Sequence, residues 1–297
     1  MPASMPLQVA SPDDVEAGRV ALEQARWRFL CEGDSWFTIG ALNPLKSANL
    51  LQHLRFSQRC WAVNCGYPGD VLSHMIDRSA DAKFTSLLLG RPMRRRRPWD
   101  ALLVSAGGND LIDALAVPPD SAAATDLSLR LLRTADEWGA AADGAARYVS
   151  AAGWQRFADY LDANLRLLVQ LRDDPASESR GVPIFMHTYS IPTPCDRAAG
   201  AGAGPWLLPS LRRYAIPPED GPALAELLLR RLAAALESSA AALPNVHVFN
   251  SLGDELGIVR WRDDDDGDWS NEIHLLPSGC AKLGAAWSQA IEQTLAR

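Results

Sequence analysis

Long apolar runs are missing from this sequence of 297 residues. No stretch approaches the roughly 20 consecutive apolar residues that span a bilayer, so we expect no transmembrane helix. Residues 1–18 are polar with several acidic side chains and contain no apolar core of a signal peptide. A mature chain that had lost its leader would show the same pattern; with that alternative open, we expect a cytoplasmic protein.

Cysteine is scarce and shows no spacing pattern. Five cysteines occur, an odd number, and none belongs to a C-x-x-C pair. Reduced thiols in a cytoplasmic protein are the simplest interpretation. The histidines form no metal-ligand spacing with one another or with cysteine, so we expect no resident metal ion.

An excess of basic charge is also absent. The chain has 29 Lys and Arg against 36 Asp and Glu, a formal net charge of −7, which argues against a general surface for nucleic acid or anionic membranes. No G-x-G-x-x-G or G-x-x-x-x-G-K-[ST] pattern follows an expected strand, so no nucleotide cofactor is implied. The acidic run 263–268 suggests calcium. However, aligning Gly267 with the EF-hand glycine puts Arg262 and Ile273 at ligand positions, which favours a solvated loop.

The sequence does contain an alternation of apolar strands and amphipathic helices. We expect strands at 27–31, 60–64, 101–105, 182–188 and 246–249, and helices at 12–24, from about 43, at 71–84, 154–168, 222–241 and 277–295. This alternation predicts an α/β fold with a parallel sheet covered on both faces. Residues 1–26 form an N-terminal extension and helix, and 27–297 a single domain with insertions near 117–150 and 191–218. The second insertion holds six prolines, and we expect no regular element there.

Glycine and a polar residue follow three of the expected strands. The three blocks are Gly33-Asp34-Ser35, Asn64-x-Gly66-x-x-Gly69-Asp70 and Gly107-Gly108-Asn109-Asp110, and a fourth, Asn271-Glu272-Ile273-His274, precedes the last helix. The carboxyl ends of parallel strands form the edge where open α/β folds place their sites. We therefore expect these blocks to meet at one site.

In order and content, the four blocks resemble the SGNH (GDSL-type) hydrolase and esterase superfamily, named for its Ser, Gly, Asn and His blocks. The resemblance extends from Trp27 to Gly284. It implies a flavodoxin-like three-layer α/β/α sandwich with a five-stranded parallel sheet in the order 2-1-3-4-5. It also implies a serine esterase that cleaves carboxylic esters, most simply short acyl or acetyl esters, through an acyl-enzyme and without a cofactor.

The resemblance also assigns the site residues. Ser35 is the nucleophile, and His274 is the base that takes its proton. The oxyanion hole consists of the backbone N–H groups of Ser35 and Gly69 and the side-chain amide of Asn109. The residues alone leave other interpretations open, in which Gly66 and Gly69 shape a turn and Asn109 caps a helix.

The third member of the triad departs from the family pattern. The family usually has an acid three residues before the histidine, and that position is Asn271 here. An amide oxygen can still accept a hydrogen bond from the imidazole and fix its tautomer, although it lacks the charge of a carboxylate. We predict that Asn271 orients His274, with Asp268 as the runner-up and Glu272 as a further nearby acid.

The missing acid leaves a second function open, a catalytically degenerate binding protein on the same fold. For the enzyme, the expected partner is a small-molecule ester, with no nucleic acid. The sequence does not indicate an oligomeric state.

Overall fold

In this computed structural model the described residues are 4–38, 48–90, 97–120, 126–252, 254–262 and 265–297. The strands are β1 (Met5–Pro6), β2 (Gln8–Ala10), β3 (Trp27–Gly33), β4 (Arg55–Phe56), β5 (Cys60–Asn64), β6 (Ala101–Ser105), β7 (Ile184–His187) and β8 (Val246–Phe249). The α-helices are α1 (Pro12–Glu16), α2 (Leu72–Met75), α3 (Ala82–Leu89), α4 (Gly108–Ala116), α5 (Ala151–Arg172), α6 (Leu208–Arg213), α7 (Gly221–Ala241) and α8 (Pro277–Leu295). Short 3₁₀ helices are η1 (Leu22–Gln24), η2 (Leu50–His53), η5 (Leu127–Leu129), η6 (Ala135–Glu137), η7 (Ala141–Tyr148), η8 (Pro218–Asp220) and η9 (Asp254–Leu256).

The main sheet is parallel and has the strand order β2-β5-β3-β6-β7-β8. Strand β3 lies in the middle, and its consecutive residues Phe29 and Leu30 are both fully buried. Consecutive side chains of a strand point to opposite faces, so both faces of the sheet are covered. The predicted α/β class and the order of the five predicted strands are confirmed.

The strand count was wrong by one, because β2 adds a sixth strand beside β5, with Val9 opposite Ala62. Its three residues carry no clear apolar pattern, and the neighbouring edge of β5 provides its hydrogen-bond partners. A separate two-stranded antiparallel sheet pairs β1 with β4.

Several expected helices differ in length. The helix expected at 12–24 ends as α1 at Glu16, because Gly18 follows with a left-handed φ of +66°. The helix expected at 71–84 is two helices, α2 and α3, and Asp81 caps the second of them. The helix expected from about residue 43 begins outside the described residues, and the described chain that follows forms η2.

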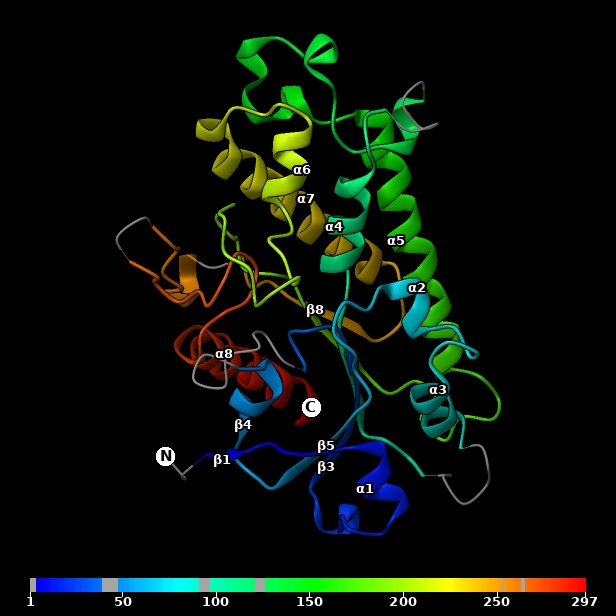
Figure 1. The fold of residues 1–297 in the computed structure, drawn as a ribbon. Coiled ribbons are helices and arrows are strands. Elements are labelled where there is room, and N and C mark those ends of the chain that lie inside the picture. The colour runs from blue at the N-terminus through cyan, green and yellow to red at the C-terminus, as the bar shows by residue number, and fades with distance from the viewer. Residues whose placement is uncertain (1–3, 39–47, 91–96, 121–125, 253, 263–264) are drawn as a thin grey trace.

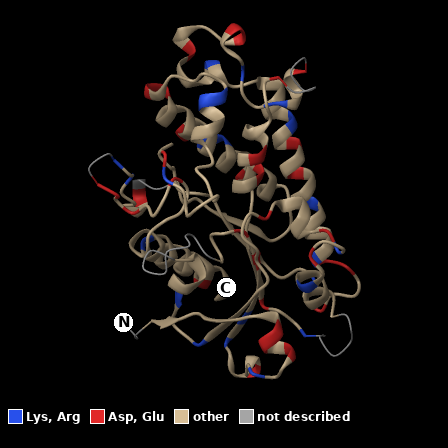
Figure 2. Cartoon of the chain, viewed as in Figure 1, with Lys and Arg blue, Asp and Glu red and all other residues tan. Residues whose placement is uncertain are grey.

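Helices lie on both sides of the sheet (Figure 1). Helices α3 and α5 cover one face together with α7, and α8 covers the other, beside η2 and β4. Acidic and basic residues are interspersed along the helices in this view (Figure 2). No helix in the described ranges is both long and apolar enough to cross a membrane.

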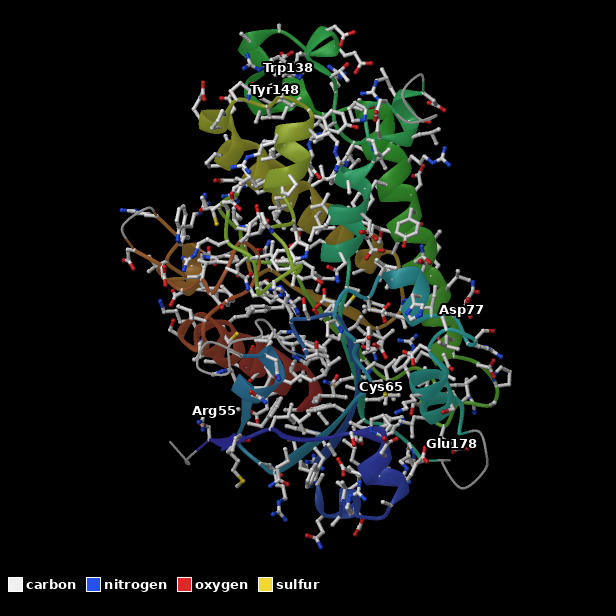
Figure 3. The ribbon with its side chains drawn as sticks, in the orientation of Figure 1. Arg55, Cys65, Asp77, Trp138, Tyr148 and Glu178 are labelled. Atoms are coloured by element: carbon white, nitrogen blue, oxygen red, sulfur yellow. The ribbon has the colours of Figure 1, made fainter. Side chains whose placement is uncertain are left out.

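The insertion near 117–150 packs at the far end of the molecule. Trp138 and Tyr148 meet there edge to face, with ring centroids 5.0 Å apart, well away from Cys65 near the sheet (Figure 3). Tyr148 is fully buried, and its hydroxyl donates to Asp220 just before α7. These contacts tie the insertion to α7 rather than to the carboxyl edge of the sheet.

Candidate active site

The turn after β3 places Ser35 at the carboxyl edge of the sheet. The Asp34 N–H donates to the Ser105 carbonyl of β6 (3.1 Å), and the Asp34 Oδ1 accepts from the Trp36 N–H (2.9 Å). A Cβ on Gly33 would lie 2.9 Å from both the Phe37 ring and the Ser105 Cβ, so glycine is required at this close approach. The Phe37 N–H donates to the Asp34 carbonyl (3.1 Å), which closes a turn over residues 34–37 that carries Ser35.

Ser35, His274 and Asn271 are joined by hydrogen bonds. The His274 Nε2 lies 2.7 Å from the Ser35 Oγ, and its Nδ1 lies 2.9 Å from the Asn271 Oδ1. The amide oxygen only accepts, so Nδ1 carries the proton and Nε2 is free to accept from the serine hydroxyl. The same Oδ1 accepts from the backbone N–H groups of Ile273 (3.2 Å) and His274 (3.0 Å), which holds the Asn271 side chain in place.

The carboxylates of Asp268 and Glu272, the two acidic alternatives to Asn271, accept hydrogen bonds from other groups. Asp268 accepts from the Lys282 Nζ (2.6 Å) and the Val259 N–H (2.7 Å). Glu272 accepts from backbone N–H groups of the 191–218 segment. Of the three candidates, Asn271 is thus the one whose side chain hydrogen-bonds to the His274 ring.

Burial controls the charge of His274. Its residue is 4% exposed, and this burial lowers the pKa of His274 from 6.5 to about 4. An imidazole with this pKa is neutral at pH 7, which is the form that accepts a proton. A carboxylate partner would instead favour the charged form.

The residues expected to form the oxyanion hole border the same space. Gly69 has a φ of +82°, and a Cβ built on it meets nothing within 4 Å. The Asn109 Nδ2 donates to the Asp70 carbonyl (2.9 Å), which fastens the amide to the turn that carries Gly69. An amide NH₂ has two hydrogens, so one remains for a ligand.

Two cavities meet at Ser35, Asn109 and Ile273. The smaller, of about 40 Å³, is mostly apolar and is lined further by residues such as Trp36, Leu111, Ile112, Leu207 and Leu229. The larger, of about 310 Å³, runs past Gly69, Trp206 and His274. The Ser35 hydroxyl therefore lies between an apolar pocket and a more open cleft.

A separate Ser-His-Asp set, formed by Ser105, His187 and Asp34, lies behind the turn that carries Ser35 and was not anticipated. The Ser105 Oγ donates to the Asp34 Oδ1 (2.9 Å) and lies 3.1 Å from the His187 Nε2, and the Tyr189 hydroxyl donates to Asp34. Ser105 and His187 are fully buried, and burial lowers the pKa of His187 to about 4. Ser105 lines neither cavity at Ser35.

The sequence carried a signal for this network. Ser105 and His187 are the last residues of the adjacent strands β6 and β7, and Asp34 follows the next strand, β3. Polar residues that end neighbouring parallel strands lie together. Trp36 packs over this network, with its ring centroid 5.5 Å from that of His187 and 5.1 Å from that of Tyr189.

Other sequence candidates take structural roles. The five cysteines are all free thiols. In the acidic loop, where 263 and 264 lie outside the described residues, Asp265 accepts from the Gly267 N–H, and Asp266 pairs with Arg197. No group of three or more His, Cys, Asp or Glu among the described residues is arranged to hold a metal ion.

Comparison of the sequence with protein-family models and with curated proteins finds no match. Among solved structures, the lipase Lip_vut3 from a goat rumen metagenome is similar, with a TM-score of 0.51 at 11% identity over 89% of this chain and 96% of the lipase. Est24, a carbohydrate acetylesterase from Sinorhizobium meliloti, has a TM-score of 0.47 at 11% identity over 91% and 100% of the two chains. An aryl esterase from M. smegmatis has a TM-score of 0.45 at 14% identity over 90% and 99%. The likeness to the lipase confirms the predicted fold.

Proposed function

We propose that this protein is a serine esterase that hydrolyses carboxylic esters of short acyl groups. The observation that carries the proposal is the hydrogen-bonded line from Ser35 through His274 to Asn271 at the junction of two cavities. The names of the similar solved structures, among them a lipase and a carbohydrate acetylesterase, agree with this class of reaction.

The proposed reaction assigns a step to each of these groups. The Ser35 Oγ attacks the ester carbonyl carbon while its proton passes to the His274 Nε2. The carbonyl oxygen becomes an oxyanion that accepts from the Ser35 and Gly69 N–H groups and from the Asn109 amide. When the bond to the alcohol breaks, His274 returns the proton to the leaving oxygen. Water then attacks the acyl-enzyme with His274 again as the base, which releases the acid and restores Ser35.

The size of the apolar cavity supports a short acyl group. One water needs roughly 10–15 Å³ of such space, so a cavity of about 40 Å³ holds only a few heavy atoms. The open cleft past Trp206 and His274 leaves more room for the alcohol. We therefore assign the apolar cavity to the acyl group and the cleft to the leaving group.

The test is direct capture of the acyl-enzyme. With p-nitrophenyl acetate we expect steady turnover and, after an acid quench, an acetyl group on the peptide that contains Ser35. A fluorophosphonate probe should label the same serine and block turnover. Binding of esters without turnover or labelling would instead indicate the degenerate binding protein.

The dependence of activity on pH is expected to differ from that of an ordinary histidine base. Because the pKa of free His274 is about 4, kcat/KM should stay level from pH 7 to about pH 5 and fall with an apparent pKa near 4. In Asn271→Asp, a carboxylate beside the imidazole favours the charged form of His274. The fall of kcat/KM at low pH should therefore shift toward neutral pH. Stopped or continuous assays with p-nitrophenyl acetate across pH 4–8 measure both profiles.

Acid instability needs its own control. The unfolded chain takes up a proton on His274 at about 6.5 and the folded chain only at about 4, so folding becomes less favourable as the pH falls across this window. Enzyme incubated at each acidic pH should therefore be assayed again at pH 7. If kcat/KM of the wild type fell reversibly with an apparent pKa near 6.5, this result would contradict a buried, neutral His274.

A further inference from the structure

Glu272 makes an unusual set of contacts between the site and the 191–218 segment. Its carboxylate is buried, with the residue 1% exposed, and it accepts from the N–H groups of Leu207 (2.7 Å), Leu208 (2.8 Å), Cys195 (3.3 Å) and Trp206. Its own N–H donates to the Arg197 carbonyl (3.1 Å). One side chain thus fastens both ends of the proline- and glycine-rich loop to the chain segment that carries His274.

Two of the residues held by Glu272 line different cavities. Leu207 lines the apolar cavity, and Trp206 lines the open cleft. The Trp206 ring meets the His274 ring edge to face, with centroids 5.2 Å apart. Ile273, directly after Glu272, lines both cavities.

We propose that Glu272 is a positioning residue whose carboxylate holds Trp206 and Leu207 as a partition between the acyl cavity and the leaving-group cleft, and that this partition sets the preference for short acyl groups. The assignment of the two cavities rests on the proposed esterase function. Glu272 itself touches neither nucleophile nor base. It acts through the backbone of residues 206–208, whose N–H groups would lose this acceptor; the bond to Leu207 is buried, and those to Trp206 and Leu208 are partly buried.

The charge and shape of the carboxylate matter for this role. Two oxygens with about four lone-pair sites can accept four N–H groups, whereas an amide offers one oxygen and places N–H donors against N–H donors. Burial raises the pKa of Glu272, and the backbone N–H groups at Leu207, Leu208, Trp206 and Cys195 act in the opposite direction. Glu272→Gln keeps the size of the side chain and replaces one of the two acceptor oxygens with an NH₂ donor.

The first readout is acyl-chain selectivity. For Glu272→Gln we expect KM for p-nitrophenyl acetate to rise about tenfold with kcat changed less than about threefold. The ratio of kcat/KM for p-nitrophenyl octanoate to that for the acetate should rise about tenfold, because the apolar cavity opens when Leu207 moves. Leu207→Ala, which enlarges the apolar cavity directly, should also raise this ratio. It tests the role of the partition in selectivity if Glu272→Gln does not fold.

The second readout does not depend on activity. Trypsin should cleave after Arg197 faster in Glu272→Gln than in wild type, because the segment loses its anchor. Glu137→Gln is the matched control. Glu137 also accepts from a backbone N–H, that of Thr134 (2.8 Å), and pairs with Arg130, but it lines neither cavity.

We expect Glu137→Gln to leave the selectivity ratio and the cleavage after Arg197 unchanged. Unchanged selectivity and cleavage in Glu272→Gln, with hydrolysis still dependent on Ser35, would overturn the partition and leave the esterase function standing. Absence of hydrolysis in wild type would overturn the esterase function, and the trypsin result would still decide whether Glu272 anchors the segment.

Discussion

Replacing Ser35 with alanine is expected to lower kcat for p-nitrophenyl acetate by roughly 10⁴- to 10⁶-fold. Without its Oγ no acyl-enzyme forms, and only slow attack by water assisted by His274 and the oxyanion donors remains. The lost hydrogen bond to His274 should cost about 1 kcal/mol of the free energy of unfolding, so the melting temperature should fall by only about 2–4 °C. Initial rates and thermal unfolding of the two proteins measure both effects.

Ser105→Ala is the matched control for this experiment. Ser105 belongs to a buried set of Asp, Ser and His, yet it is fully buried and lines neither cavity at the candidate site. We expect it to lower the melting temperature through the lost bonds to Asp34 and His187, and to keep kcat within about tenfold of wild type. Labelling by a fluorophosphonate that survives Ser35→Ala and disappears in Ser105→Ala would make Ser105 the nucleophile.

Local patterns were sufficient for five of the six strands of the main sheet and for the positions of the four blocks. Strands β3, β5, β6, β7 and β8 are short apolar runs, and most end in turns rich in glycine, so sequence alone locates them. Parallel strands place their carboxyl ends at one edge, where Ser35 follows β3. His274 lies 239 residues further along, just before α8, and is within hydrogen-bond distance of Ser35. The contact between Asn271 and His274 is local, by contrast, since the two residues share one turn.

Long-range contacts explain what the sequence did not reveal. The prediction of no regular element in 191–218 was wrong, because α6 forms there with its first N–H groups accepted by Glu272, 64 residues beyond Leu208. Asp268 is near His274 in sequence, but its carboxylate is bound by Lys282 of α8. Neither contact leaves a periodic or turn pattern, so neither is visible in the sequence.

The burial of acidic residues is also hard to predict from the sequence. Glu32 lies on β3 and is 1% exposed, and burial together with the nearby carboxylate of Asp81 raises its pKa. The sequence places a charged residue at the end of an apolar strand, where it is expected to face solvent. Only the packing of α3 against β3 brings Asp81 to it.

Asn109→Ala is expected to lower kcat by about 10²- to 10³-fold and to change KM by less than about threefold. The side-chain amide interacts with the carbonyl oxygen most strongly once that oxygen carries negative charge, so its loss raises the barrier without weakening substrate binding. The Asn109 Nδ2 bond to the Asp70 carbonyl (2.9 Å) aims the group before substrate arrives, which means that little reorganisation is needed at the moment of reaction. Steady-state kinetics with p-nitrophenyl acetate separate kcat from KM.

Asn109→Asp distinguishes an oxyanion donor from a residue that only supports the turn. It preserves the size of the side chain but presents acceptors, and a negative charge, where the oxyanion forms, so its kcat should fall at least as far as that of Asn109→Ala. Both variants should still be phosphonylated by a fluorophosphonate, with fluoride as the leaving group, because Ser35 and His274 remain paired. A kcat within about threefold of wild type in Asn109→Ala would remove Asn109 from the oxyanion hole and leave the N–H groups of Ser35 and Gly69 as its donors.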